Sequence, residues 1–519
     1  MSLSPTTTIP ATPARKKRMD LYAFGANDEG QLGDGQVREK QLVPTRISRS
    51  YNPHFINGLE LDEEIHGLDL CTIRSGAKHT ILLTSTHDVY VTGDNCYRQL
   101  GYCKHQEEVW VTSDYRVRGF LPRYHDISLC AATWTSSAYT PNHGKSGIQE
   151  APEPLIYIEG RGLVGELGRD NVTDTRFPTN FPTLSEPNST MDKESSTLSE
   201  RDTTNTEPMN LSGRNEITDT DPPTHSGHAD TDAEPPMLSE HDNADRKLLS
   251  PSVWGPGRHQ FYPVEPLEFR FQCEIKDIQA GHSHYVALLI DGTVWGWGSN
   301  AKSQLGVNLP SQVATPTQLT LPFEGVCAVV CGKEFTYLVG NPQSGQHTIL
   351  GKDKWRIQSN KPPQVSSWSS IHATWHSIYI LFDNGTLQAW GKENNFQLIP
   401  PDLPLIKQFS AGSDHVLALT RDGMVLAWGN AEHGNCGDVA SMPVLGPGKY
   451  LTGTWYEITR IPGRIVSVHA GNATSFVVTE VESLIVGHGE TPIIHNEHTK
   501  NKLGRPTKDV QGEIADLIF

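Results

Sequence analysis

The chain has 519 residues, of which 36% are hydrophobic and 20% charged, and its formal net charge is −17. The hydrophobic share lies below the roughly 45–50% of an average globular domain, which indicates a packed part diluted by a polar part. The sequence contains no apolar run of the roughly 18 residues that a membrane-spanning helix needs, and its negative charge argues against broad binding to nucleic-acid phosphates. We therefore expect neither a membrane protein nor a protein that binds DNA directly.

Residues 1–19 are expected to form a disordered tail, because they combine Ser, Thr and Pro with the basic cluster Arg15–Arg18. An apolar stretch is missing beside that cluster, so we do not expect a secretory signal. The eight cysteines are scattered and form no CxxC motif, which favours a reducing compartment. With the weak resemblance of the basic cluster to a nuclear import signal, this predicts a cytoplasmic and nuclear protein.

A repeated pattern organises most of the remaining chain. Two stretches show it best, 278–306 (IQAGHSHYVALLIDGTVWGWGSNAKSQLG) and 409–437 (FSAGSDHVLALTRDGMVLAWGNAEHGNCG). Each runs from Ala-Gly through a histidine and an apolar run to Asp-Gly, and then through a second apolar run to Trp-Gly. The glycines of Ala-Gly and Trp-Gly are 17 residues apart in both stretches. Apolar runs joined by Asp-Gly are the strongest short-range signal for a β-hairpin.

The same spacing identifies weaker copies of this pattern. They are Gly76 to Gly93 and Thr374 to Gly391, which also span 17 residues, Gly332 to Gly351, which spans 19, and Thr133 to Gly160, which spans 27 with an insertion at 141–150. A first half without a clear second half opens at Gly471. A second half without a first half, LYAFGANDEGQLGDG, occupies residues 21–35.

The repeat length and the divided unit predict an all-β fold, a closed seven-bladed β-propeller. The repeated regions, 21–170 and 265–480, supply about 52 residues for each of seven units, which suits a four-stranded antiparallel sheet with its loops. A linear stack of such sheets would leave two apolar end sheets exposed. We therefore expect the strand at 21–25 to complete the sheet begun at 465–479, so that the N- and C-terminal strands share one blade.

Residues 171–250 interrupt the repeats. This segment holds 16 Asp and Glu residues against 6 Lys and Arg, together with 22 Ser and Thr. It cannot bury enough apolar area to offset the entropy of ordering it, so we expect a disordered acidic insertion, with a phosphorylatable docking segment as the alternative. The predicted organisation is therefore a tail at 1–19, propeller blades at 20–170 and 251–480 around this insertion, and a partly disordered tail at 481–519.

The recurring histidines admit two interpretations. His79, His284 and His415 each follow the glycine of the first half by three residues. A ring of catalytic or metal-binding histidines is one interpretation, but repetition favours a structural role in which each histidine bonds the backbone of its own blade. We expect no metal and no cofactor. Packing between blades is the role expected of Trp295, Trp297, Trp390 and Trp428.

The pattern Ala-Gly-x-x-His … Trp-Gly … Gln-Leu-Gly resembles the repeats of the regulator of chromosome condensation family. Its closing tripeptide occurs at 31–33, 99–101 and 304–306. Within that family, LYAFGANDEGQLG, WGWGSNAKSQL, CGKEFTYLV and EHGNCG are similar to the fungal α-tubulin suppressor group, also called killer-toxin-insensitivity proteins. The resemblance implies a non-catalytic propeller that forms a heterodimer with a small zinc-finger protein of the CSL type. That partner donates electrons in diphthamide synthesis on elongation factor 2, and the pair supports Elongator-dependent modification of wobble uridines in tRNA.

Partner contacts are expected where the blades depart from the repeat, because a scaffold alone has no reason to break it. The candidates are Trp134, Lys333, Glu334, Phe335, Trp375 and His376 beside the glycine positions, and Glu432, His433 and Asn435 in the turn after Trp428. The alternative function is guanine-nucleotide exchange on a Ran-type nuclear GTPase, the activity of the family's best-known member. An enzyme is not expected, because the sequence has no phosphate-binding loop, Gly-x-Ser-x-Gly or HExxH motif.

Overall fold

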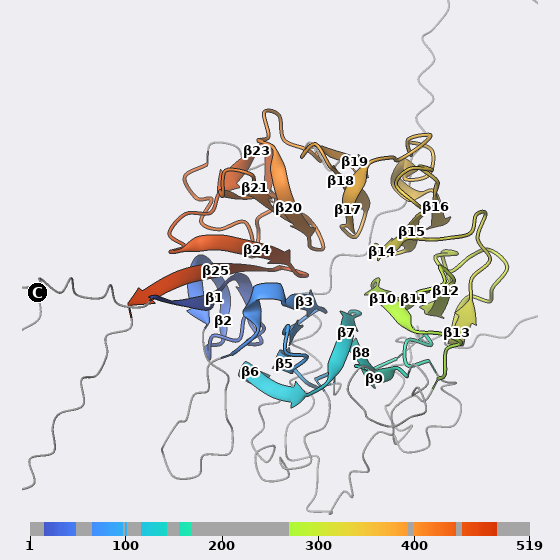
Figure 1. Ribbon diagram of the computed structural model, residues 1–519, viewed down its shortest axis with the longest axis horizontal. Helices are drawn as coiled ribbons and strands as arrows, with labels where there is room; N and C mark the ends of the chain where they lie inside the picture. The colour runs from blue at the N-terminus through green and yellow to red at the C-terminus, as the bar shows by residue number, and fades with distance from the viewer. Residues whose placement is uncertain are drawn as a thin grey trace, which may run out of the picture.

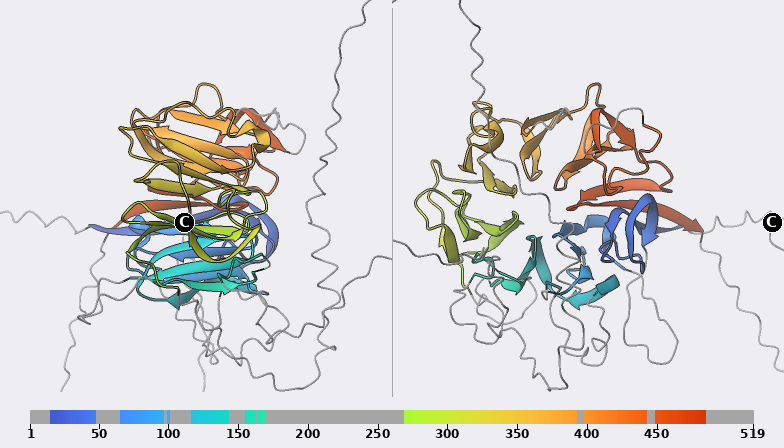
Figure 2. Two further views of the ribbon diagram at one scale, coloured as in Figure 1. Left: turned by 90° about the vertical axis from the view of Figure 1, so that its right-hand side faces the viewer. Right: turned by 180° about the vertical axis from the view of Figure 1, so that it is seen from behind.

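The structure is a computed structural model that describes residues 15–47, 65–96, 99–100, 116–142, 155–162, 164–168, 269–392, 398–442 and 449–484. These residues form seven antiparallel β-sheets, which stand as blades around a central axis (Figure 1). Figure 2 shows the same ring from the side and from behind. The expected seven-bladed propeller is therefore confirmed. The described part contains no helix with the length and apolar character that crossing a membrane requires.

Each blade runs outward from an innermost strand. The innermost strands are β3 (Thr72–Ser75), β7 (Ile127–Ala132), β10 (Ile275–Ala280), β14 (Ala328–Cys331), β17 (Trp368–Ala373), β20 (Ile406–Ala411) and β24 (Arg464–Ala470). The second strands are β4 (His79–Leu83), β8 (Ser136–Pro141), β11 (His284–Leu289), β15 (Phe335–Val339), β18 (Ser377–Phe382), β21 (His415–Thr420) and β25 (Thr474–Leu484). The third strands are β5 (Val89–Asp94), β9 (Tyr157–Gly160), β12 (Val294–Ser299), β16 (His347–Gly351), β19 (Leu387–Gly391), β22 (Val425–Asn430) and β1 (Arg15–Asn27).

Four blades have a fourth, outermost strand among the described residues. These strands are β6 (Arg116–Tyr124), β13 (Gln312–Gln318), β23 (Tyr450–Glu457) and β2 (Arg38–Ile47). The second strands are the most buried, since neighbouring blades cover both of their faces. In β11 and β21 every residue is buried, which explains their continuous apolar sequences.

The ring closes through a blade that both ends of the chain build. Its strand order is β2-β1-β25-β24, and the register places Leu21 opposite Val478 and Phe24 opposite Ser475. Leu21 and Phe24 are completely buried. The expectation that the strand at 21–25 completes the sheet begun at 465–479 is therefore confirmed.

This shared blade is longer than the sequence suggested. β1 begins at Arg15 and β25 ends at Leu484, so the tails expected at 1–19 and 481–519 are wrong for residues 15–19 and 481–484. Lys17 of the basic cluster lies beside a carboxylate of the neighbouring strand: its Nζ lies 2.5 Å from Glu480 Oε1, and Arg464 also pairs with Glu480. The acidic insertion expected at 171–250 lies outside the described residues.

The expectation of four strands in every blade is wrong for the blade of β14, β15 and β16. Residues 352–367 are described throughout, and they form the short 3-10 helix η4 (Lys354–Arg356) and loops in place of a fourth strand. Pro362 and Pro363 lack the backbone N–H groups that a strand would donate, and the rest of the segment is mostly polar. This irregular segment lies beside the candidate site described below.

The tryptophans of the third strands join neighbouring blades. The indole Nε1 of Trp297 donates a hydrogen bond to the carbonyl of Glu166 (3.1 Å), and that of Trp428 to the carbonyl of Leu398 (2.8 Å). Trp390 bonds Ile357 in the same way, at 2.9 Å. In each case the acceptor lies in the loop after the third strand of the preceding blade, so the expected packing is confirmed for these three. Trp295 instead contacts Phe269 and Phe271, which precede β10.

Candidate partner-binding face

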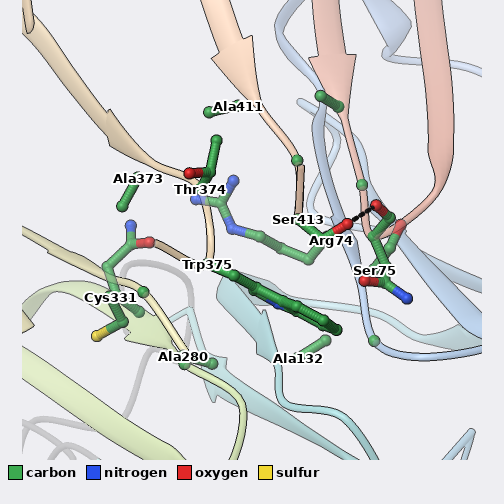
Figure 3. A pocket seen from close by; sticks show the side chains of 18 of the residues that line it. Arg74, Ser75, Ala132, Ala280, Cys331, Ala373, Thr374, Trp375, Ala411 and Ser413 are labelled. Atoms are coloured by element: carbon green, nitrogen blue, oxygen red, sulfur yellow. Dashed lines mark hydrogen bonds between the residues drawn. The ribbon is translucent and has the colours of Figure 1, made fainter. Parts of the chain in front are cut away.

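The innermost strands end around one mouth of the central channel. The first residue after each of them lines a cavity of about 140 Å³ (Figure 3). These seven residues are Gly76, Thr133, Gly281, Gly332, Thr374, Gly412 and Gly471. We call them the slot residues, since they occupy the glycine position of the repeat.

Glycine at the slot makes room for the histidine that follows it. A Cβ on Gly281 would lie 2.1 Å from His284 Cε1 and 2.5 Å from the carbonyl oxygen of Gly332. The Nε2 of His284 lies 3.2 Å from Thr336 Oγ1 on the next blade. His79 and His415 meet a serine hydroxyl of their next blade in the same way, at 3.1 and 2.9 Å. These histidines therefore join blades, and the expectation that each bonds the backbone of its own blade is wrong.

Two blades have a threonine at the slot and a serine, instead of a histidine, three residues later. Thr133 occupies the slot, and Ser136, in place of histidine, bonds its hydroxyl at 2.6 Å. In the other blade Thr374 occupies the slot, and its hydroxyl accepts a hydrogen bond from the backbone N–H of Ser377 at 3.0 Å. A small residue three positions on therefore leaves space for a side chain at the slot.

This exchange predicts a coupled effect on stability. Gly281→Thr alone is expected to cost about 3 kcal/mol, because the new Cβ meets the His284 ring and a backbone oxygen. Combining it with His284→Ser copies the Thr-x-x-Ser blades, so the double variant should lose less stability than the two single variants added together. Urea unfolding of the four proteins measures the difference. Strict additivity would contradict the pairing.

The residues that follow the slots form two runs of backbone hydrogen bonds around the mouth. The N–H of Ala77 donates to the carbonyl of Trp134, and that of Trp134 to the carbonyl of His282, both at 3.0 Å. On the other side, Lys333 donates to Trp375 at 2.9 Å and Trp375 to Ser413 at 2.8 Å. Because each bond joins neighbouring blades, these backbones and their side chains are held in fixed positions around the mouth.

Four of these side chains, Trp134, His282, Lys333 and Trp375, form what we call the mouth cluster. The Trp134 ring stacks on His282 with centroids 5.0 Å apart, and it reaches Trp375 at 5.3 Å. Lys333 Nζ lies 5.0 Å from the centroid of Trp375. Trp134 and Trp375 come from blades that are not neighbours, so they meet over the mouth of the channel.

A second group, which we call the rim cluster, continues this surface outward. It consists of Lys354 and Trp355 in η4, His376 after Trp375, and Lys392 after β19. Lys392 Nζ lies 4.5 Å from the centroid of the Trp355 ring, and His376 lies 6.1 Å from it. Trp355 is 39% exposed, and its φ of 61° is unusual for a bulky residue. An exposed tryptophan on a left-handed backbone is a local strain that the irregular segment carries.

Among the residues of the mouth and rim clusters, only the lysines are charged. Burial, followed by nearby lysines, lowers the pKa of His282 to about 4 and that of His376 to about 3, so both rings are neutral at pH 7. Within the described residues neither Lys333 nor Lys392 forms an ion pair, whereas Lys354 lies 3.9 Å from Glu334. The face therefore presents aromatic rings and positive charge, although the chain as a whole is acidic.

Comparison with known proteins identifies the repeats. Two family models match, and both are described as the regulator of chromosome condensation (RCC1) repeat. The first matches residues 20–83 and 291–339, and the second matches residues 71–99, 275–304 and 406–435. These stretches of the chain are therefore similar to the RCC1 repeat, as the sequence pattern predicted.

Individual relatives match part of the chain. An RCC1 repeat-containing protein of Schizosaccharomyces pombe, C10F6.04, is 30% identical over 215 residues, which cover 40% of this chain and 57% of that protein. The ultraviolet-B receptor UVR8 of Arabidopsis thaliana is 30% identical over 189 residues, covering 31% of this chain and 42% of the receptor. The chain thus spans about half the length of these curated relatives.

Two solved structures share the fold. Human WBSCR16 superposes with a TM-score of 0.54 at 15% identity, covering 89% of this chain and 99% of that one. Prp20p of Saccharomyces cerevisiae gives a TM-score of 0.53 at 15% identity, covering 91% and 92%. At such identities the likeness establishes the RCC1 propeller fold alone.

The RCC1 fold brings together five of the nine residues expected to contact a partner. Trp134, Lys333 and Trp375 lie in the mouth cluster and His376 in the rim cluster, while Glu334 stands beside Lys354. Phe335 is only 5% exposed, because its ring takes the place of the repeat histidine over Gly332. A surface role for Phe335 is therefore wrong.

The turn after Trp428 lies elsewhere, against the shared blade. Asn435 is 3% exposed and donates a hydrogen bond to the carbonyl of Asn430 at 2.7 Å, so its expected contact with a partner is wrong. Glu432 pairs with Lys449 at 3.6 Å, and His433 is exposed. No described contact joins Glu432 or His433 to the mouth or rim cluster.

Sequence reasoning missed four members of this face, His282, Lys354, Trp355 and Lys392. His282 lies in a regular RCC1 repeat, and the recurring histidine of that repeat is His284, so the pattern did not indicate His282. Trp355 lies in the segment without repeat character, and its only sequence signal was a tryptophan in a polar, lysine-rich stretch. Among the described residues, no group of three or more His, Cys, Asp and Glu side chains could hold a metal ion.

Proposed function

We propose that this RCC1 propeller is a non-catalytic scaffold that binds a small CSL-type zinc-finger protein through the mouth and rim clusters. In that role it would support diphthamide synthesis on elongation factor 2 and Elongator-dependent modification of wobble uridines in tRNA. The class of partner rests on the resemblance of the sequence to the α-tubulin suppressor group. The observation that carries the binding role is the partly exposed group of aromatic and lysine side chains at the channel mouth and rim.

Several properties of this face support protein binding. Tryptophan is over-represented among residues that dominate binding energy, and rigid, partly exposed rings lose little entropy when a partner covers them. Backbone hydrogen bonds between blades hold Trp134 and Trp375, and the Trp134 ring stacks on His282. The ring of Trp355 contacts His376 edge-on. Lys333 and Lys392, which form no ion pair within the described residues, favour an acidic surface on the partner.

A scaffold role also fits the use of the recurrent histidines. The Nε2 atoms of His79, His284 and His415 face hydroxyl groups of neighbouring blades, and all three side chains are buried. Their chemistry is therefore used within the fold. The cytoplasm and the nucleus are the compartments that we propose for this activity.

Binding to a recombinant CSL-type zinc protein tests the proposal. Titration calorimetry should detect binding to the full chain, and Trp375→Ala should weaken it about 30-fold, as expected for a central tryptophan anchor. Trp355→Ala should act in the same direction with less risk to folding, because that side chain is 39% exposed. Trp455→Ala, a partly buried tryptophan on the outermost strand β23, is the matched control and should bind normally. Absence of binding at micromolar concentrations would overturn the proposal.

Nucleotide exchange on a Ran-type GTPase is the second candidate function. The observation in its favour is the fold shared with Prp20p, whose structure was described together with its binding to Gsp1p and histones. Release of a fluorescent nucleotide from a Ran-type GTPase, measured with and without this chain, distinguishes the two functions. Acceleration would favour exchange, and an unchanged rate alongside CSL binding would favour the scaffold.

A further inference from the structure

The wall of the central cavity contains a single ionised side chain. Among the residues that line it there is no Asp, Glu or Lys, and Arg74 on β3 is the only arginine. His372 and His469 lie beside Arg74, and burial lowers the pKa of the first to about 3 and of the second to about 4. Both are therefore neutral at pH 7, and the cavity carries one positive charge.

Arg74 has no directly paired counter-charge within the described part of the chain. No hydrogen bond or ion pair involves its guanidinium there, and its Nε is buried without a partner. The charges of Asp277 and Arg74 both act on the Cys130 thiol, but Asp277 does not line the cavity and forms no ion pair with Arg74. Its carboxylate accepts a hydrogen bond from the Gln279 amide at 2.9 Å instead. Figure 3 shows the Arg74 side chain extending into the cavity in the direction of Thr374. A partly buried guanidinium without an acceptor strongly favours an anion beside it.

The surroundings of Arg74 indicate what kind of anion fits. The cavity of about 140 Å³ has room for a side chain but not for a folded element. Trp134, His282 and Trp375 surround its entrance, and Lys333 lies beside Trp375 as a second positive charge. Arginine presents a planar fork of donors that matches a carboxylate, and aromatic walls suit the aliphatic part of an acidic side chain.

We propose that the channel mouth is an oxyanion site in which Arg74 binds the carboxylate of an acidic segment on the partner. The identity of that partner rests on the proposed function, but the site itself does not. The mouth cluster contacts the body of the segment, and one of its carboxylates lies in the cavity. Arg74 thereby acts as a specificity residue that selects acidic partners.

A peptide that needs no CSL protein tests the site on the full chain. Hexaglutamate should produce a saturable change in tryptophan fluorescence, since Trp134 and Trp375 line the cavity. Arg74→Met should weaken this binding about tenfold or more, and Arg74→Lys should weaken it less. Arg421→Met is the matched control, because Arg421 lies in the turn between β21 and β22, at the other end of those strands from the slots. A parallel titration with inorganic phosphate at equal ionic strength tells a site for protein carboxylates from a site for small free anions. A site for free anions would bind phosphate at least as tightly as the peptide.

The outcomes separate this proposal from the proposed function. Loss of peptide binding in Arg74→Met with an unchanged or higher melting temperature supports the site, because the variant removes an uncompensated charge without breaking a bond. Equal binding by the parent and Arg74→Met, no binding by the parent, tighter binding of phosphate, or a lower melting temperature of Arg74→Met would each overturn it. If the CSL protein fails to bind while the peptide binds through Arg74, only the proposed function falls.

Discussion

Deletion of residues 1–25 is expected to destabilise the whole ring rather than one blade. The deletion removes the third strand of the shared blade, leaving β2 without its inner neighbour and β25 with an open edge. Leu21, Tyr22 and Phe24 are buried in this strand, and burial of each large side chain contributes about 1.5–3 kcal/mol. The combined loss is comparable with the roughly 5–15 kcal/mol by which a typical domain is stable. Thermal unfolding followed by circular dichroism should show a much lower midpoint.

Deletion of residues 1–14 is the matched control for this experiment, because it stops before β1 begins at Arg15. That variant should melt like the full chain. A synthetic peptide of residues 15–47, which contains β1 and β2, should raise the melting temperature of the longer deletion in a concentration-dependent way. An unchanged midpoint for the longer deletion would show that the ring does not depend on its closure.

The closed ring could be predicted from the sequence because its signal is local and repeated. A spacing of 17 residues between two glycines marks three hairpins and leads to the weaker copies. The half-units at the two ends imply that one blade is divided. The structure pairs β1 with β25 as that division requires. The extension of β1 to Arg15 could not be predicted, because four successive basic residues are typical of a solvated tail unless acidic partners lie opposite. Glu480 is such a partner, but it lies far away in sequence.

The partners of the histidines were predicted wrongly for a related reason. Spacing within one blade shows that His284 and Gly281 belong together, but it carries no information about which side chain of the next blade faces the ring. That residue is Thr336, the second residue of β15. A hydroxyl residue stands at the corresponding place, Ser137 and Ser475, opposite the other two histidines. Contacts between blades are therefore regular, but they become visible only when the blades are stacked.

The candidate site was predicted in part. Trp134 and Trp375 each follow a threonine that takes the place of the slot glycine, and a departure from the repeat at a turn indicates a surface function. Phe335 and Asn435 depart from the repeat as well, yet both are buried, because a changed residue can equally serve local packing. The sequence alone does not separate these causes. Trp355 could not be predicted, since no repeat exists there against which to notice it.

Mild acid is expected to unfold the propeller, because the histidines that join its blades are buried as neutral rings. Burial lowers the pKa of His79 to about 4, and those of His284 and His415 to about 3. In the unfolded chain a histidine has a pKa near about 6.5. The unfolded state therefore binds more protons below that pH, and stability falls as the pH falls from about 6.5 towards the folded values. Each histidine contributes about 1.4 kcal/mol per pH unit in this window.

At pH 5 the loss amounts to about 2 kcal/mol for each of these histidines, so the three together remove a large part of a typical domain's stability. Urea unfolding between pH 7.5 and 4.5 measures it as a steep fall in the free energy of unfolding. Carboxylates whose pKa is lowered, such as Asp28 and Asp88, add to the loss only as the pH approaches their ordinary values near about 4, so the two effects occupy different windows. The His415→Asn variant should have a lower free energy of unfolding at pH 7.5. Between pH 6 and 5 that free energy should fall less steeply than in the parent, because unfolding takes up about one proton fewer. A free energy of unfolding that stays constant from pH 7 to 5 would show that these rings are not held neutral by the fold.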